Sequence, residues 1–205
     1  MDDELRQLSE GGDTAVAELF SKCRDRLARM VRFRLDPRLR GRADVEDILQ
    51  DAYVKVSARI EDYIARPTVS FYVWARQITR QTLIDFHRVQ MGQKRDPKQE
   101  VRRRRGGQGA NTSYSMTLAL VGQYTSPSAA AVRKERVESL HHALDAMDET
   151  DREVLALRHF EQLTNKEVAE ALELSPTAAS NRYVRALQRL GEIMGSLPGF
   201  QDATQ

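Results

Sequence analysis

The chain has 205 residues and a formal net charge of +2, with 30% charged and 6% aromatic residues. This length fits one domain or two small ones, and the composition favours a soluble helical protein over a β-rich one. No apolar run approaches the roughly 20 residues of a membrane span, and the acidic start MDDELRQL does not resemble a signal peptide. The single cysteine, Cys23, excludes an internal disulfide framework and favours a cytoplasmic location.

Residues 1–88 are predicted to form a first helical module. Apolar residues recur at helical spacing in three runs, at 19–31, 45–56 and 71–82. Asp36 before Pro37 and the stretch 66–68 separate these runs, because the residue before a proline disfavours helical backbone. We therefore expect three helices here and no strand.

The second of these runs carries acidic residues away from its apolar stripe. Asp44, Asp47 and Asp51 fall on one side of the expected helix, with Gln50 alongside. A solvated helix surface explains most such stripes. The alternative is a docking face for a basic partner.

The third run combines aromatic and basic residues. Phe71, Tyr72 and Trp74 lie within four positions, and the basic residues that follow are Arg76, Arg80 and Arg88. Aromatic faces and guanidinium groups are what unstacked single-stranded bases require. Phe71 and Trp74 are three residues apart and also fit a buried face, so Tyr72 is the aromatic residue expected to be exposed.

Residues 89–130 are predicted to be a long, flexible, basic linker. This segment is charged, contains glycines and has few apolar groups, which is typical of disordered or loosely held chain. An apolar patch at 116–124 fits either a lone helical turn or a docking segment. The four arginines at 102–105 fit non-specific attraction to DNA or RNA phosphates, or a solubilising tether.

Residues 131–195 are predicted to form a second helical module that contains a helix-turn-helix. Thr164 and Glu167 have the spacing of a capping box. Ser175 can cap a second helix, with Pro176 at its first position. The inward stripe of that helix is predicted to consist of Ala179, Tyr183, Ala186 and Leu190. The tail, 196–205, is expected to fray.

The outward face of this second helix is suited to DNA. It carries small, amide and guanidinium side chains, which fit phosphate oxygens and base edges in a major groove. No acidic residue occurs between Ser175 and Leu190. A merely solvated polar face is the alternative, and the absence of acids favours DNA. The candidate residues are Thr177, Ala178, Ser180, Asn181, Arg182 and Arg185.

No catalytic constellation is evident in the sequence. There is no phosphate-binding loop. Neighbouring His141 and His142 point about 100° apart on a helix, and His87 and His159 lack partners at ligand spacing. We therefore expect no catalytic residue, cofactor, metal site or small-molecule substrate, and no enzymatic activity.

Three motifs together resemble an extracytoplasmic-function (ECF) sigma factor of the sigma-70 family. They are DVEDILQDAYVKV at 44–56, FYVWARQITRQTLIDFHR at 71–88 and the long run from 151 to 190. Their order and spacing agree with the family over nearly the whole chain except the linker and the tail. The resemblance implies a bacterial transcription initiation factor with two helical domains, which binds core RNA polymerase and promoter DNA.

The resemblance also implies roles for particular residues. Asp44, Asp47, Gln50 and Asp51 would bind core RNA polymerase. Tyr72, Arg76, Arg80, Gln81 and Arg88 would bind and help open the promoter −10 element, and the outward face of residues 177–185 would read the −35 element as duplex. The Arg80 and Gln81 pair departs from the Arg-Asn pair of many relatives, which leaves base preference open. Many relatives have an anti-sigma partner, although no residue here identifies one.

Two other classes fit part of the sequence. A stand-alone helix-turn-helix regulator that binds palindromic DNA as a dimer would explain residues 133–195, but would leave 44–56 and 71–88 as mere core. A helical enzyme or an RNA-binding protein is the second alternative. The missing catalytic cluster argues against an enzyme, whereas the basic linker leaves RNA binding open.

Overall fold

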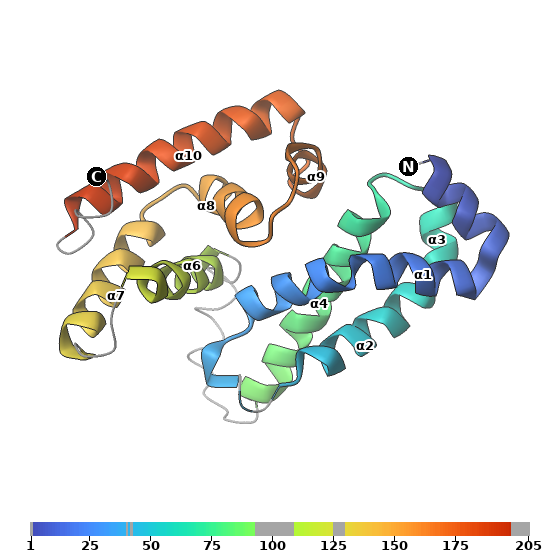
Figure 1. Ribbon diagram of the computed structural model, residues 1–205, viewed down its shortest axis with the longest axis horizontal. Coiled ribbons are helices and arrows are strands. Elements are labelled where there is room, and N and C mark those ends of the chain that lie inside the picture. The colour runs from blue at the N-terminus through green and yellow to red at the C-terminus, as the bar shows by residue number, and fades with distance from the viewer. Residues whose placement is uncertain (1, 40, 42, 93–108, 125–129, 198–205) are drawn as a thin grey trace. The chain divides into compact units, whose positions relative to one another are not determined.

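The computed structural model describes residues 2–39, 41, 43–92, 109–124 and 130–197, and all regular elements within these ranges are helices (Figure 1). The predicted all-α fold class with two helical modules is therefore confirmed. The chain forms two compact units, namely residues 1–95 with 169–174, and residues 96–168 with 175–205. In the part of the chain that is described, every helix is too short or too polar to span a membrane. The arginine run at 102–105 and most of the tail lie outside the described residues.

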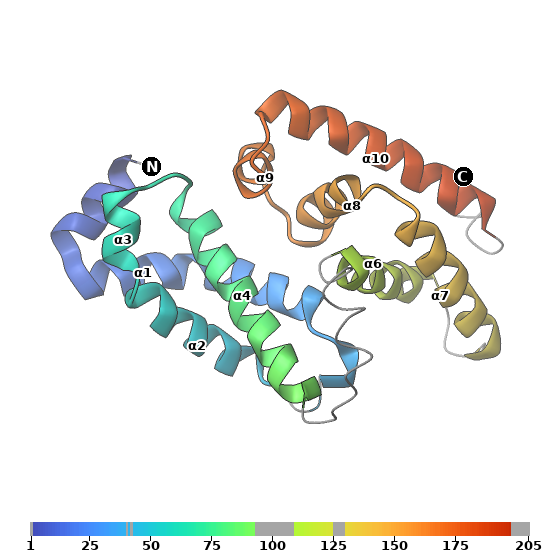
Figure 2. The same ribbon diagram turned by 180° about the vertical axis from the view of Figure 1, so that it is seen from behind.

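The first unit is a bundle of α1 (Asp2–Arg34), α2 (Val45–Ser57), α3 (Ile60–Ala65) and α4 (Phe71–Gly92), with a short 3₁₀ turn, η1, at Pro37–Leu39. Helices α1, α2 and α4 pack against one another, as Figures 1 and 2 show from opposite sides. Their facing stripes exclude water almost completely, and burial of these side chains is the main source of stability in the unit. The stripes include Leu27, Met30, Val31, Ile48, Leu49, Val56 and Val73.

Helix α1 begins earlier than the sequence pattern predicts and bends at a pair of glycines. Gly12 has a φ of 52° and a ψ of −140°, which side chains rarely tolerate. At the preceding Gly11, an added Cβ would lie 2.7 Å from the Cβ of Ala15. Both positions therefore favour glycine, and the segment before the bend buries Leu8.

The second unit contains α6 (Gly109–Tyr124), α7 (Ala130–Asp145), α8 (Glu149–Leu155) and α10 (Pro176–Ser196). Helix α9 (Asn165–Ala171) begins in this unit, which includes it up to Val168. A π-helical turn, η2, continues α8 at Ala156–Phe160. Helix α10 packs on α8 and α7, and α6 packs on the same two helices. Met116, Leu140, Leu144, Leu155 and Leu157 are among its buried side chains.

Helix α6 lies within the segment predicted to be a flexible linker, and the prediction is wrong for residues 109–124. The apolar patch at 116–124 is the second half of a 16-residue helix. Three hydroxyl residues, Thr112, Ser113 and Thr117, are buried on its inner side. The Thr112 hydroxyl donates to Oε2 of Glu153 at 3.0 Å, and the Thr117 hydroxyl donates to the Ser113 carbonyl at 2.7 Å. These bonds satisfy polar groups that would otherwise be costly to bury.

The turn of the helix-turn-helix places Glu173 in left-handed backbone, with a φ of 55°. This conformation costs an L-residue about 1–2 kcal/mol, whereas glycine adopts it freely at an entropic cost of roughly 0.5–1 kcal/mol. We therefore expect Glu173→Gly to stabilise the fold by up to about 1 kcal/mol. Urea unfolding followed by circular dichroism measures this change. The matched variant Glu173→Ala keeps a Cβ and should give no gain, so equal stabilisation by both variants would contradict the explanation.

Candidate nucleic-acid interface and partner surface

Helix α10 begins where the sequence predicts, because two local devices fix its start. The Ser175 hydroxyl accepts a hydrogen bond from the Ala178 backbone N–H at 3.1 Å, and Pro176 occupies the first turn. The Asn165 side-chain amide donates to the Pro176 carbonyl at 2.9 Å, which ties the start of α9 to the start of α10. The predicted capping box also forms, with the Thr164 backbone N–H donating to Glu167 at 2.8 Å.

The outward face of α10 is polar and exposed as predicted, with two differences. Thr177, Ser180, Asn181 and Arg185 are exposed, and Ala178 is half-buried. The first difference is Val184, which is 51% exposed on the same face and was not among the residues predicted for it. Its spacing of seven from Thr177 and three from Asn181 would have identified it.

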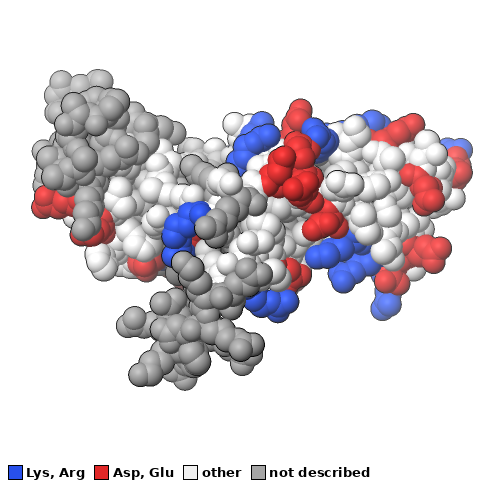
Figure 3. Space-filling view, turned by 90° about the horizontal axis from the view of Figure 1, so that it is seen from below, with Lys and Arg blue, Asp and Glu red and all other residues white. Residues whose placement is uncertain are grey.

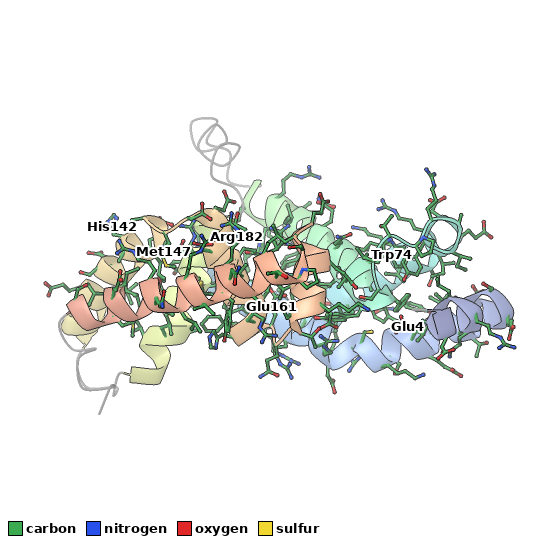
Figure 4. The ribbon with its side chains drawn as sticks, turned by 90° about the horizontal axis from the view of Figure 1, so that it is seen from above. Glu4, Trp74, His142, Met147, Glu161 and Arg182 are labelled. Atoms are coloured by element: carbon green, nitrogen blue, oxygen red, sulfur yellow. The ribbon has the colours of Figure 1, made fainter. Side chains whose placement is uncertain are left out.

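The second difference is Arg182, which pairs within the protein. Its Nη1 lies 2.8 Å from Oδ1 of Asp151 and 3.2 Å from Oδ1 of Asp148, both at the start of α8. Asp148 is also the N-cap of α8 and accepts from the Thr150 and Asp151 backbone N–H groups. The hydrogen bond to Asp151 and the charges of both carboxylates raise the pKa of Arg182 above its ordinary value. Arg182, labelled in Figure 4, thus joins α10 to α8.

On the inward side of α10, Ala179 and Ala186 are buried, whereas Tyr183 and Leu190 are half-buried. The Tyr183 hydroxyl is 3.1 Å from Nε2 of His159. The Arg158 guanidinium lies 5.1 Å from the centre of the same ring, within the range of a cation–π interaction. The predicted inward stripe of α10 therefore consists of two buried alanines, a half-buried leucine and a tyrosine that contacts His159.

Helix α2 presents the predicted acidic face to solvent. Asp47, Gln50 and Asp51 are exposed, while Ile48, Leu49 and Ala52 between them are buried. Asp44 is also exposed and caps the helix, because its side chain accepts from the Glu46 backbone N–H. Figure 3 views the molecule from the side on which α2 lies in Figure 1, and acidic side chains cluster on that face.

An exposed apolar residue lies at the C-terminal end of this acidic face. Val54 is 61% exposed and follows Asp47, Gln50 and Asp51 by seven, four and three residues, so it shares their side of the helix. Val54 was not among the residues predicted for this face. An exposed apolar side chain beside carboxylates is typical of a protein-binding surface.

Only some of the α4 residues that were predicted to bind single-stranded DNA are accessible. The predicted exposure of Tyr72 is wrong, because the ring is 5% exposed and the Arg26 guanidinium of α1 lies 3.6 Å from its centre. Arg76 is also buried, at 3% exposure. The side chains that remain accessible are half-buried Arg80 and exposed Gln81 and Arg88.

Asp85 organises the accessible end of α4. Its carboxylate lies 3.2 Å from Nη2 of Arg88 and 3.3 Å from the Gln81 amide nitrogen. Lys55 of α2 approaches the same carboxylate at 3.6 Å. Asp85 therefore partly neutralises the basic groups that a DNA phosphate would meet.

The other two aromatic residues of the α4 start belong to the core side, as predicted. Phe71 is buried, and half-buried Trp74 stacks on Tyr63 of α3 with ring centres 4.5 Å apart. The Tyr63 hydroxyl donates to the Val69 carbonyl at 2.9 Å. Burial, together with the nearby charge of Glu4, raises the pKa of Tyr63 to about 12. The phenol therefore remains a neutral donor at physiological pH.

His87, near the end of α4, is predicted to make the first unit sensitive to acid. Its Nε2 accepts a hydrogen bond from the Asp36 backbone N–H at 3.3 Å, which requires a neutral ring. Burial lowers the pKa of His87 below 6.5, and the charge of Arg38 also lowers it, against the opposing charge of Asp36. The unfolded chain then binds the proton more readily, so the free energy of unfolding should fall as pH falls from 6.5 toward that lowered pKa.

The fluorescence of Trp74, the only tryptophan, reports unfolding of this unit in urea at several pH values. His87→Gln removes the titrating group and should flatten the dependence in this window. An unchanged slope in the variant would rule out His87 as its source.

Across the ranges that the structure describes, no group of three or more His, Cys, Asp or Glu side chains is placed to hold a metal ion. The two surfaces described above are instead binding surfaces, one acidic on α2 and one free of acids on α10.

Comparison with known proteins matches both units to one family. A model described as Sigma-70 region 2 matches residues 19–92, and one described as Sigma-70, region 4 matches residues 137–190. RNA polymerase sigma factor SigZ of Bacillus subtilis (strain 168) is 24% identical over 157 residues, covering 77% of this chain and 76% of that protein. ECF RNA polymerase sigma factor SigX of the same organism is 27% identical over 156 residues, covering 76% and 73%.

A solved structure, CnrH in complex with the cytosolic domain of CnrY, resembles the chain with a TM-score of 0.51. The sequence identity is 21%, and the match covers 98% of this chain and 97% of that one. At this identity the likeness concerns the fold alone.

Region 2 and region 4 in this order define a promoter-recognition subunit of RNA polymerase. The chain belongs to the sigma-70 family as an ECF sigma factor, and it directs RNA polymerase to promoters. Its partners are core RNA polymerase and promoter DNA, and the family is non-enzymatic. The stand-alone regulator is therefore the wrong class, because region 2 would have no place in it.

Proposed function

We propose that the chain divides its function among three surfaces: the acidic face of α2 binds core RNA polymerase, α4 binds the −10 element, and α10 reads the −35 element. The observation that carries this division is the segregation of charge between the exposed faces of α2 and α10. One face carries three acids and ends at Val54, and the other has no acid from Ser175 to Leu190. Opposite charge on two faces suits two different partners.

The polymerase-binding surface consists of Asp44, Asp47, Gln50 and Asp51, with Val54 at its C-terminal end. The carboxylates attract a basic surface of core RNA polymerase and speed the encounter. Val54 supplies an apolar contact that loses water when the partner covers it. Asp44 also caps α2, so part of its contribution is structural.

The −10 surface consists of Arg80, Gln81 and Arg88 on α4. Their guanidinium and amide groups bind phosphates and base edges of the opened strand, and so help to open the promoter. Tyr72 and Arg76 support this surface from beneath, because both are buried in the first unit. Trp74 is the more accessible aromatic residue at the start of the helix.

The −35 surface consists of Thr177, Ala178, Ser180, Asn181 and Arg185 on α10, which enter the major groove of duplex DNA. Arg182 holds the helix at its angle on α8 through Asp148 and Asp151 and thereby positions the reading face. Two reading units on one chain bind a bipartite site more tightly than either unit alone.

Two further parts of the proposal concern regulation and location. The resemblance to CnrH, whose structure contains the cytosolic domain of CnrY, supports an anti-sigma factor as an additional partner. Bacterial transcription takes place in the cytoplasm, where the chain would act.

Reconstitution with bacterial core RNA polymerase tests the proposal as a whole. The complex is expected to start transcription at a defined set of promoters, and core polymerase alone is not. Start sites mapped genome-wide would give the −35 and −10 elements that the later experiments use. A chain that binds core polymerase without changing the choice of start site would contradict the assignment of α4 and α10 to DNA.

A further inference from the structure

Val184 is an apolar side chain in the middle of the polar face of α10. It is 51% exposed, and its neighbours on this face are Ser180 four residues before, Asn181 three before and Gln188 four after, all exposed. Thr177, also exposed, lies two turns before it. The valine therefore lies on the surface that faces the proposed DNA partner, toward its C-terminal end.

Packing within the protein does not account for a valine at this position. The buried residues of α10 are Ala179, Ala186 and Ile193, which lie on another side of the helix. Helix propensity does not account for it either, because β-branched residues are weaker helix formers than alanine, glutamine or arginine. The side chain of valine has restricted rotation about χ1, so it holds two methyl groups in a fixed position.

We propose that Val184 recognises the C5-methyl group of a pyrimidine in the −35 element. The only apolar group that a base pair presents in the major groove is the methyl group of thymine, or of 5-methylcytosine where DNA is methylated. Asn181, one turn away, carries the amide that can pair with adenine N6 and N7. An A·T pair offers the adenine edge and the methyl group together, so the two side chains suit one A·T-containing step. This inference rests on the proposed −35 role of α10.

The test compares DNA with and without the methyl group, using the reconstituted holoenzyme. Thymines of the mapped −35 segment are replaced by uracil in both strands, which removes C5-methyl groups and leaves every hydrogen-bonding group in place. The wild-type holoenzyme is expected to bind about three- to fourfold more weakly for each recognised methyl group that is removed, as for loss of one buried methylene. Uracil in the spacer between the elements is the control and should have no effect.

The matched variant is Val184→Ala, which shortens the side chain and keeps the helix. It is expected to bind thymine DNA about three- to fourfold more weakly than the wild type and to bind uracil and thymine DNA equally. A comparison of cytosine with 5-methylcytosine at the recognised position tests whether the methyl group can come from methylated cytosine as well as from thymine. If 5-methylcytosine at the recognised position tightens binding by wild type and not by the variant, methylated cytosine is read as well.

Three outcomes are distinguishable. In the first outcome, the wild type binds thymine and uracil DNA equally, and a scrambled −35 segment abolishes binding. This result overturns the role of Val184 and leaves the −35 role of α10 intact. A Val184→Ala variant that binds more weakly but keeps the full uracil effect also overturns it, because the valine then touches another group of DNA or polymerase. No effect of scrambling the −35 segment contradicts the proposed function itself.

Discussion

The double variant Asp47→Lys, Asp51→Lys is expected to bind core RNA polymerase about 30-fold more weakly than the wild type, a loss of about 2 kcal/mol. Both carboxylates are exposed on the same side of α2 as Val54, so the variant places two ammonium groups against a partner surface that we propose to be basic. Like charges facing each other across an interface cost several kcal/mol. A fluorescence-anisotropy titration with labelled sigma factor measures the affinity.

The matched control is Glu61→Lys, Asp62→Lys. These two acids are also exposed in the first turn of a helix of the same unit, and the change in net charge is identical. The control should lose less than about threefold, because surface charges outside an interface act only at long range and are screened within about 10 Å in 0.1 M salt. Equal losses in both pairs would mean that overall charge, and not the α2 face, governs binding.

Stability has to be separated from binding in this comparison. Asp47 lies in the first turn of α2, where a carboxylate contributes about 0.3–1 kcal/mol through the helix dipole. Glu61 and Asp62 both lie in the first turn of α3, so the control should lose at least as much stability as the test variant. Trp74 fluorescence reports whether the first unit remains folded in each case.

Features that depend on a few neighbouring residues could be predicted from the sequence. The start of α10 follows from a serine cap, a proline at the first position and the amphipathic spacing after them, all within one stretch of chain. The capping box of Thr164 and Glu167 and the acidic face of α2 are equally local. Such features require no knowledge of what lies on the other side of the helix.

Features that depend on a distant element could not be predicted. Tyr72 lies off the apolar stripe of α4, yet Arg26 of α1 covers its ring. Arg182 belongs by spacing near the reading face, yet the carboxylates of Asp148 and Asp151, more than 30 residues earlier, hold it. In both cases the chemistry of the residue is evident from its type, and only the tertiary fold supplies its partner.

Helix α6 could not be predicted for another reason, because polar residues interrupt its buried side. The helix buries Thr112, Ser113 and Thr117 along with Met116 and Val121, so it lacks a continuous apolar stripe. Hydrophobic periodicity is the main signal for an amphipathic helix. A helix that buries hydroxyl groups and satisfies them by hydrogen bonds gives a weak signal and is easily taken for linker.

Removing the partner of Arg182 gives the second prediction, and it separates two roles by the sign of the effect. If Arg182 contacts DNA directly, Asp151→Ala removes the nearer of its two carboxylate partners and a negative charge, and should tighten binding to the −35 element. If Arg182 positions α10, the same change leaves only the bond to Asp148 to join Arg182 to α8 and should weaken binding. We expect weakening by about fivefold, or roughly 1 kcal/mol, in holoenzyme binding to a −35-dependent promoter.

Asp151 is the better target of the two partners, because Asp148 is also the N-cap of α8 and its loss would cost about 1 kcal/mol of helix stability by itself. A half-exposed ion pair contributes only about 0–1 kcal/mol to folding, so the variants should remain folded at assay temperature. Circular dichroism of each variant checks this directly.

The double variant Arg182→Ala, Asp151→Ala completes a double-mutant cycle with the two single variants. Residues that act as a pair give non-additive losses, so the double variant should bind about as weakly as either single variant, and not about 25-fold more weakly. Arg189→Ala serves as the charge-matched control on the same helix, since Arg189 pairs only locally with exposed Glu192 at 2.8 Å and its loss should change binding less than threefold. Tighter binding by Asp151→Ala that is lost in the double variant would instead return Arg182 to the DNA-reading face, because a gain that requires the guanidinium does not come from loss of the Asp151 charge alone.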